Sequence, residues 1–215
     1  MQIKGIRSRF LIKKYGAPEE RDTVAAINVL VQDHGIDLMD MQDLYEMGEH
    51  EQIYSLVPMG DLTSTDARQT IVLISTPTQL LNAAHASLSG YNFGIHVDGT
   101  HGMVLEDAQI ILIGTHDIRQ RGHRIAAAIV PNAGLNTQLM TCIFTQLKKL
   151  VELMAVARIG GEECPPGWQW NLSRILSDDE GAFRNAARVV WGDGLLSRCA
   201  PSMLHKQQKR QAHPS

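Results

Sequence analysis

The first third of the chain carries apolar residues at the three- and four-residue spacing of amphipathic helices. Within residues 19–57 these positions are Val24, Ile27, Leu30, Val31, Leu38, Met41, Leu44 and Tyr45. Because an α-helix repeats every 3.6 residues, this spacing gathers the apolar side chains on one side of each helix. Gly35 separates the two runs, and Gly60 follows the second. We therefore predict a small helical segment over residues 1–69, with its apolar stripe serving as packing surface.

A different pattern begins at residue 70, where β-branched and apolar residues follow one another without a break. Residues 70–76 (TIVLIST) have the composition of a strand, and Pro77 ends the run. A short helix is predicted over residues 78–86, with Thr76 or Thr78 as its N-terminal cap.

Three further apolar runs and one long amphipathic segment come next. Residues 92–97, 108–114 and 124–130 predict three strands, and the segments between them contain glycine and polar residues. Runs of this kind at short intervals are typical of an antiparallel meander. A long helix then begins at Asn136 or Thr137, either of which can serve as the N-terminal cap. Its apolar side carries Leu139, Ile143, Leu147, Leu150, Val151 and Met154.

The remaining segments complete an alternation of strands and helices. Residues 171–177 predict a strand and residues 180–191 a helix. A further strand is predicted over residues 195–200, followed by a polar, basic helix over residues 202–211. The order of elements from the meander onward is therefore β-β-β-α-β-α-β-α.

This order predicts an α/β fold: an RNase H-like mixed sheet with flanking helices over residues 70–215, preceded by the small helical segment. In such a fold a right-handed crossover through a helix brings the fourth strand parallel to the first. The first strand runs into Asp98, and the fourth stops at Asp178. We therefore expect these two carboxylates to lie side by side.

Two adjacent carboxylates repel each other unless a cation lies between them. Hard oxygen ligands suit Mg²⁺ or Mn²⁺. Two such ions can activate a hydroxyl and stabilise the leaving oxygen of a phosphodiester. Asp98 and Asp178 are thus candidate metal ligands and catalytic residues. The alternative for each residue is an ordinary turn or cap residue at the end of a strand.

Charge and cysteine content narrow the class of protein. Residues 1–91 hold seven Lys/Arg against twelve Asp/Glu, whereas residues 92–215 hold thirteen against eleven. The second part is thus the weakly better candidate for nucleic-acid binding. Three sparse cysteines, Cys142, Cys164 and Cys199, argue against a disulfide framework. Without an apolar run of about 20 residues, we expect no membrane partner and a nuclear or cytoplasmic location.

The sequence around Asp98 resembles the transposase domain of Mutator-like elements (MULE), a DDE family with an RNase H-like fold. That family shows Asp-Gly-Thr after its first strand, as in DGT at residues 98–100. An apolar strand ending in Gly-Thr-x-Asp follows, here GTHD at residues 114–117. Next come a Gly-His pair, residues 122–123, and a small-residue strand, IAAAIV at residues 125–130.

A second block supports the same resemblance. The segment SDDEGAFRNAARVVWG, which begins at Ser177, is similar to the family's second acidic block, Ser/Thr-Asp-x-Glu-x-Ala at the start of a helix. This alignment places Asp178 at the catalytic position and Asp179 at the spacer, with Glu180 and Ala182 matching. The resemblance implies metal-dependent DNA strand cleavage and transfer with Mg²⁺ or Mn²⁺, and transposon ends as the DNA partner. It leaves the oligomeric state open.

The match departs from the family in two places. The Cys-x-x-His pair is not intact. The residue three positions after Cys199 is Ser202 and not a histidine, and the residue three positions before His205 is the same serine and not a cysteine. The third carboxylate, a Glu on a later helix, has no counterpart, since the sequence contains no acidic residue after Asp193. We therefore expect a truncated or decayed catalytic core that is inactive as given.

Two other functions remain open from the sequence. One is a non-enzymatic DNA-binding or regulatory protein derived from a transposase. The other is a protein-interaction domain in which the helical segment matters most. Intact Asp98 and Asp178 favour recent enzymatic ancestry over long domestication as a non-enzymatic protein.

Overall fold

One mixed sheet of seven strands forms the centre of the computed structural model. The structure describes residues 41–57, 71–89, 94–100, 109–116, 122–130, 136–177, 181–193 and 195–198. Its elements are α3 (Met41–Glu46), β1 (Ile53–Val57), β2 (Ile71–Ser75), α4 (Pro77–Leu88), β3 (Gly94–Thr100), β4 (Gln109–His116), β5 (Gly122–Val130), α5 (Thr137–Arg158), β6 (Arg174–Ser177), α6 (Gly181–Trp191) and β7 (Leu195–Arg198).

The strands lie in the order β1-β2-β5-β4-β3-β6-β7. Strands β3, β4 and β5 form the predicted antiparallel meander. Strand β6 returns parallel to β3, and β7 follows parallel to β6. The prediction of an α/β, RNase H-like mixed sheet with flanking helices is confirmed.

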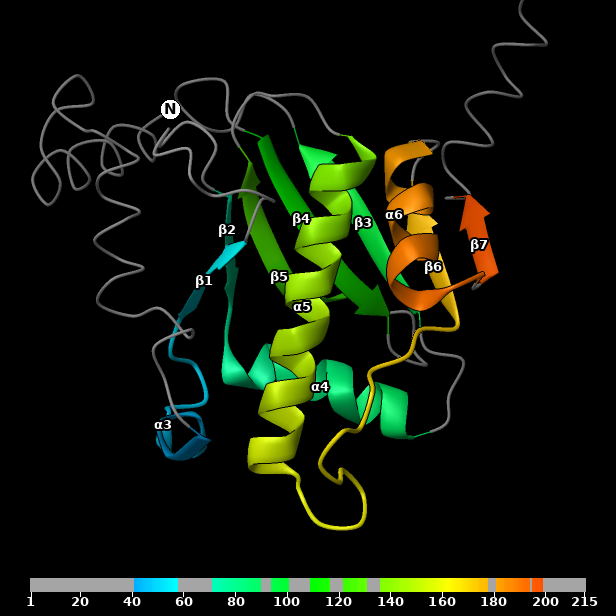
Figure 1. Cartoon of the computed structure of the whole chain (residues 1–215). Helices are drawn as coiled ribbons and strands as arrows, with labels where there is room; N and C mark the ends of the chain where they lie inside the picture. Colours follow the sequence, from blue (N-terminus) through cyan, green and yellow to red (C-terminus); the bar gives the residue numbers. More distant parts are fainter. Residues whose placement is uncertain are drawn as a thin grey trace, which may run out of the picture.

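The helices α4, α5 and α6 cover one face of this sheet (Figure 1). Helix α5 crosses the face that is turned toward the viewer, and α6 lies beside it over β6. Helix α4 contacts α5 and β5 at the lower end of the sheet. Asn136 is the N-terminal cap of α5, because its side-chain oxygen accepts a hydrogen bond from Leu139 N at 2.9 Å. Thr76 caps α4 in the same way, at 3.3 Å from Gln79 N.

The helix-covered face of the sheet holds the core. The strand register places Val97 opposite Ile113 and Ile113 opposite Ala126, so these three side chains form one row across the sheet. All three are buried, as are the facing residues Ile143, Phe144, Leu147 and Val151 of α5. Because successive side chains of a strand point to opposite faces, every second residue adds an apolar side chain to this face.

Strand β1 corrects the sequence prediction, which extended the helical segment through residue 57. Ile53, Ser55 and Val57 are buried, whereas Tyr54 between them is half-buried. This period of two belongs to a strand, and β1 pairs antiparallel with β2. The buried Ser55 hydroxyl accepts a hydrogen bond from Gln146 Nε2 of α5 at 2.5 Å. The strand therefore forms because β2 and α5 supply partners that the local sequence does not reveal.

The predicted helical segment is described only at its end. Helix α3 packs through the buried Leu44, and Met47 follows it in the same core. Arg158, at the end of α5, donates hydrogen bonds to the carbonyl oxygens of both residues. The helix predicted around Val24 to Val31 and the basic helix over residues 202–211 lie outside the described residues.

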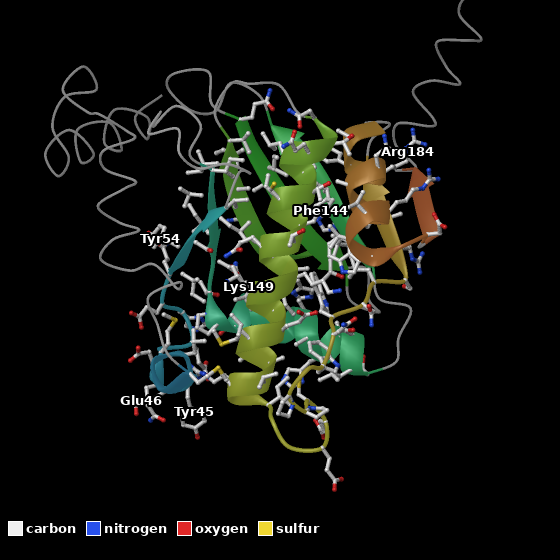
Figure 2. All side chains as sticks on the ribbon, viewed as in Figure 1. Tyr45, Glu46, Tyr54, Phe144, Lys149 and Arg184 are labelled. Atoms are coloured by element: carbon white, nitrogen blue, oxygen red, sulfur yellow. The ribbon has the colours of Figure 1, made fainter. Side chains whose placement is uncertain are left out.

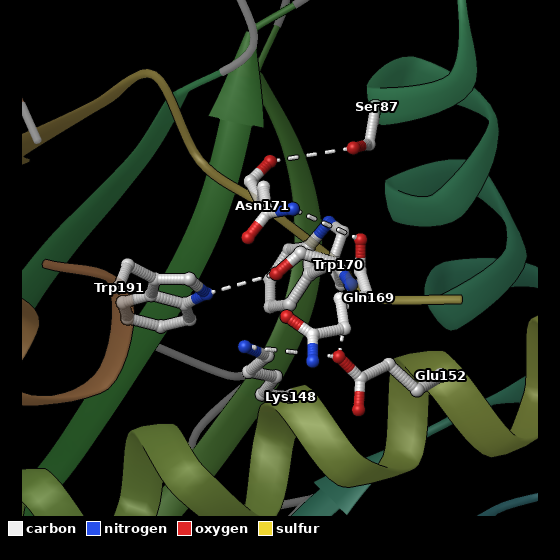
Figure 3. A network of polar contacts seen from close by, with 7 residues as sticks. All are labelled: Ser87, Lys148, Glu152, Gln169, Trp170, Asn171 and Trp191. Atoms are coloured by element: carbon white, nitrogen blue, oxygen red, sulfur yellow. Dashed lines mark hydrogen bonds and ion pairs between the residues drawn. The ribbon is translucent and has the colours of Figure 1, made fainter. Parts of the chain in front are cut away.

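The segment that leads into β6 is held by a network around Trp170 (Figure 3). The backbone N–H of Trp170 donates to Glu152 Oε1 of α5 at 2.9 Å. Trp191 Nε1 of α6 donates to the Trp170 carbonyl at 3.1 Å, and Ser87 of α4 donates to the Asn171 carbonyl at 3.3 Å. The two indole rings also meet edge to face, with centroids 5.7 Å apart. Three helices thus fix where β6 begins.

Candidate functional site

Asp98 lies within strand β3 and not after its end. The predicted strand stopped at Val97, but pairing with β4 continues through Asp98↔Leu112, Gly99↔Ile111 and Thr100↔Ile110. The Asp-Gly-Thr sequence is typical of a turn. Here the apolar strand β4 supplies a complete ladder of partners, which keeps these residues extended.

The parallel pairing of β3 and β6 places the end of β6 beside this aspartate. Val97 pairs with Ser177, the last residue of β6. Asp98 is therefore the first residue of β3 beyond the stretch that pairs with β6. Asp178 is the next residue in the chain after Ser177, and it lies outside the described residues. The expected adjacency and parallel direction of the first and fourth strands are confirmed, whereas the expected approach of the two carboxylates stays a prediction.

Asp98 points away from the helices. Its neighbour Val97 is buried on the helix-covered face, and successive strand residues alternate in direction. On the second face, register aligns Asp98 with Leu112, Ala127 and Ile74. These three apolar residues are half-buried, whereas Asp98 is exposed. An exposed carboxylate at the end of an apolar row is accessible to a cation and to a second ligand.

His96 lies on the same face, two residues before Asp98. Its ring rests against Gly114 of β4: a Cβ atom at Gly114 would come within 2.5 Å of His96 Nε2 and 2.8 Å of the His123 carbonyl oxygen. The glycine of the Gly-Thr-x-Asp motif is thus the residue that leaves room for the imidazole. In this position the ring leans toward β4, on the side of β3 away from β6.

The other motif residues have structural places or are not described. Thr115 is buried, and its hydroxyl donates to the Gly94 carbonyl at 2.7 Å, which ties β4 to β3. His123 is exposed in β5. Asp117, Cys199 and His205 lie outside the described residues. Within the described ranges, no group of three or more His, Cys, Asp and Glu side chains is placed to hold a metal ion.

Burial raises the pKa of the Cys164 thiol, which therefore stays protonated at neutral pH. Cys142 is half-buried, and both of these described cysteines are free thiols. Among the helices that the structure describes, none is long and apolar enough to span a bilayer.

Two arginines of α6 were not singled out from the sequence. Arg184 and Arg188 are four residues apart on a helix whose other side buries Phe183, Ala186 and Ala187. Arg188 is exposed and Arg184 is half-buried. The signal that was available is the Arg-x-x-x-Arg spacing in a segment without acidic residues, GAFRNAARVVW.

No protein-family model matches the chain, and no curated protein is significantly similar to it.

Proposed function

We propose that this chain carries the catalytic core of a Mutator-like DDE transposase, in which Asp98 and Asp178 hold Mg²⁺ or Mn²⁺ for DNA strand cleavage and transfer. The observation that carries the proposal is the parallel register of β3 and β6, with Val97 opposite Ser177. Each candidate carboxylate follows directly after one member of that pair in the sequence. The exposed position of Asp98 and the resemblance of the surrounding motifs support the same reading.

The donor set suits the proposed ion. Carboxylate oxygens are the ligands that Mg²⁺ and Mn²⁺ prefer. A bound ion would polarise a phosphodiester and lower the pKa of the attacking hydroxyl. Asp98 would orient that ion from β3, and the half-buried Leu112 beside Asp98 would limit the water around it. Asp178 would complete the pair from the end of β6.

Asp98 and Asp178 supply two of the three carboxylates that a DDE site needs. Two carboxylates leave a second ion without fixed ligands, so we propose that the 215-residue chain binds metal and DNA without joining DNA strands.

DNA binding with and without a divalent ion tests this function. An ion held by Asp98 and Asp178 would offset their negative charge and attract DNA phosphates, so Mn²⁺ should raise the affinity of the parent for a labelled duplex. The variant Asp98→Ala should show no such increase. Asp193→Ala is the matched control, because Asp193 is an exposed carboxylate beyond the end of α6.

The same assay separates the alternative functions. Binding that is equal in Mn²⁺ and in EDTA, and that is unchanged in Asp98→Ala, would indicate a non-enzymatic DNA-binding protein and reject the proposed metal site. Failure to bind DNA under either condition would reject the transposase reading and leave a protein-interaction domain.

A further inference from the structure

Arg124 of β5 lies on the same face of the sheet as Asp98. Gly114 of β4 belongs to this second face, because the His96 ring packs where a Gly114 side chain would stand. The register places Arg124 directly opposite Gly114. Residues that are directly opposite each other in an antiparallel pair point to the same side of the sheet. The Arg124 side chain therefore belongs to the second face, and it is exposed there.

A bulge in β5 turns this side chain away from the core. The register between β4 and β5 shifts between Ile113 and Gly114. Ile125 and Ala126 are consecutive residues of β5, and both are buried. Arg124, the residue before them, is exposed. Because a bulge redirects the side chains beside it, and bulges often lie next to functional sites, Arg124 is a candidate for contact with a ligand.

Arg124 gives the second face a positive charge that no described carboxylate neutralises. Within the described ranges, no Asp or Glu side chain forms an ion pair with it. The lysines and arginines of α5 and α6 belong to the opposite side of the sheet, where Figure 2 labels Lys149 and Arg184. A guanidinium group binds phosphate oxygens in a bidentate geometry, and it keeps its charge at every physiological pH. The ligand that suits Arg124 is therefore a phosphate group.

The distance from Asp98 to Arg124 matches a short stretch of DNA backbone. Asp98 lies two residues after His96 on β3, and Arg124 lies in the row of His96, two strands away. With about 3.3 Å per residue along a strand and about 4.8 Å between strands, the two Cα atoms are about 12 Å apart. One strand of a duplex carries a phosphate for every ~3.4 Å of helix axis. The two positions would therefore span about three nucleotides.

We propose that Arg124 binds a backbone phosphate of duplex DNA and so places the duplex over the second face of the sheet, with a nearby phosphate at Asp98. The inference rests on the proposed function, because the bound duplex would be the substrate of the Asp98 site. A contact to the backbone carries no sequence information. Arg124 therefore positions the duplex and does not select its sequence.

The test measures binding to a labelled random-sequence duplex in EDTA, over a series of salt concentrations. Arg124→Gln should bind more weakly than the parent, and its slope of log affinity against log salt should become shallower by about 0.9, the value for one lost phosphate contact. Arg188→Gln is the matched control, because Arg188 is an exposed cation of α6, on the opposite side of the sheet. The control should keep the parent slope.

A second variant separates loss of the contact from loss of fold. Arg124→Lys keeps the charge and should retain the parent salt slope, with a smaller loss of affinity than Arg124→Gln. Identical slopes for these two variants would overturn the proposal. So would an Arg124→Gln variant that binds DNA as the parent does, or a parent that binds no DNA in EDTA.

Two further comparisons locate the contact and separate it from the metal site. If Arg188→Gln lost as much of the salt slope as Arg124→Gln, the DNA would not be bound on the second face in particular, and the proposal would fail. The EDTA assay does not depend on metal. An Asp98-dependent effect of Mn²⁺ with an unaffected slope in Arg124→Gln would therefore reject the Arg124 contact alone, and the reverse result would reject the metal site alone.

Discussion

Val97 of β3 and Ser177 of β6 are partners in parallel register, and both side chains are buried. Their burial on the helix-covered face fixes which way the adjoining residues point. A shift of one residue in this register would turn each strand's side chains to the opposite face. The core contacts of Val97 and Ser177 therefore hold Asp98 on the exposed second face, beside the end of β6.

The close contact of His96 with Gly114 predicts a large effect of a small substitution. Gly114→Ala places a methyl group 2.5 Å from His96 Nε2 and 2.8 Å from the His123 carbonyl oxygen. Because the second neighbour is backbone, it cannot move away alone, and we expect a loss of about 1–3 kcal/mol in the free energy of unfolding. Denaturant unfolding measures it.

Gly181→Ala is the matched control for this substitution. No atom lies within 4 Å of a Cβ at Gly181, which begins α6. Alanine favours helices over glycine, so this variant should unfold at the same or slightly higher denaturant concentration than the parent. Equal stability of Gly114→Ala and the parent would show that the His96 ring is not held against β4.

The buried hydrogen bond between Gln146 and Ser55 predicts non-additive effects. Ser55→Ala removes the acceptor of Gln146 Nε2 and leaves a buried amide, which costs about 1–3 kcal/mol. Replacing both partners, Ser55→Ala with Gln146→Leu, should recover most of this loss, because the buried amide of Gln146 is then removed as well. Unfolding of both single variants and the double variant completes the cycle. Additive losses of unfolding free energy would contradict the hydrogen bond between Ser55 of β1 and Gln146 of α5.

The fold was largely predictable from the sequence, because most of its helices and strands are long enough to show a regular spacing of apolar residues. The meander, α5 with its Asn136 cap, and β7 follow from apolar spacing and capping chemistry. Strand β1 did not follow, since five residues give too short an alternation. Its strand conformation depends on β2 and on Gln146, both distant in the sequence.

The candidate site was predictable in its topology and not in its local detail. Asp98 was identified from its motif, and the adjacency of its strand to β6 followed from the order of elements. The sequence suggested a turn at Asp98, whereas the pairing with Leu112 keeps it in a strand. The close fit of His96 over Gly114 depends on cross-strand register, which no local pattern encodes.

Glu152 predicts a dynamic effect on the segment before β6. Glu152→Ala removes the acceptor of the Trp170 backbone N–H, so the amides of the loop between α5 and β6 should exchange with deuterium faster than in the parent. Glu163→Ala is the matched control, because Glu163 is exposed in the same loop. Unchanged exchange at Trp170 would mean that Trp191 and Ser87 suffice to hold this segment.

Catalysis by the chain as given should be absent. Each 1.36 kcal/mol of lost transition-state stabilisation lowers the rate about tenfold, and Asp98 and Asp178 alone leave a second ion without fixed ligands. Glu180 is not expected to supply ligands to that second ion. A carboxylate directly before α6 is stabilised by the positive N-terminal end of the helix. The assay incubates the protein with end-labelled duplex DNA and Mn²⁺. Cleaved or joined products from the parent that vanish in Asp98→Ala would contradict this expectation.

The central claim is that Asp98 and Asp178 together hold a divalent ion, and a Mn²⁺ titration tests it most directly. Paramagnetic broadening of amide resonances in β3 and β6, with calorimetry on the same samples, reports both the place and the affinity of binding. We predict weak binding by the parent, because two carboxylates leave most of the coordination sphere to water. Asp193→Ala should bind equally well, whereas the double variant Asp98→Ala, Asp178→Ala should lose both signals. A double variant that binds Mn²⁺ as tightly as the parent would contradict the metal site and the function built on it.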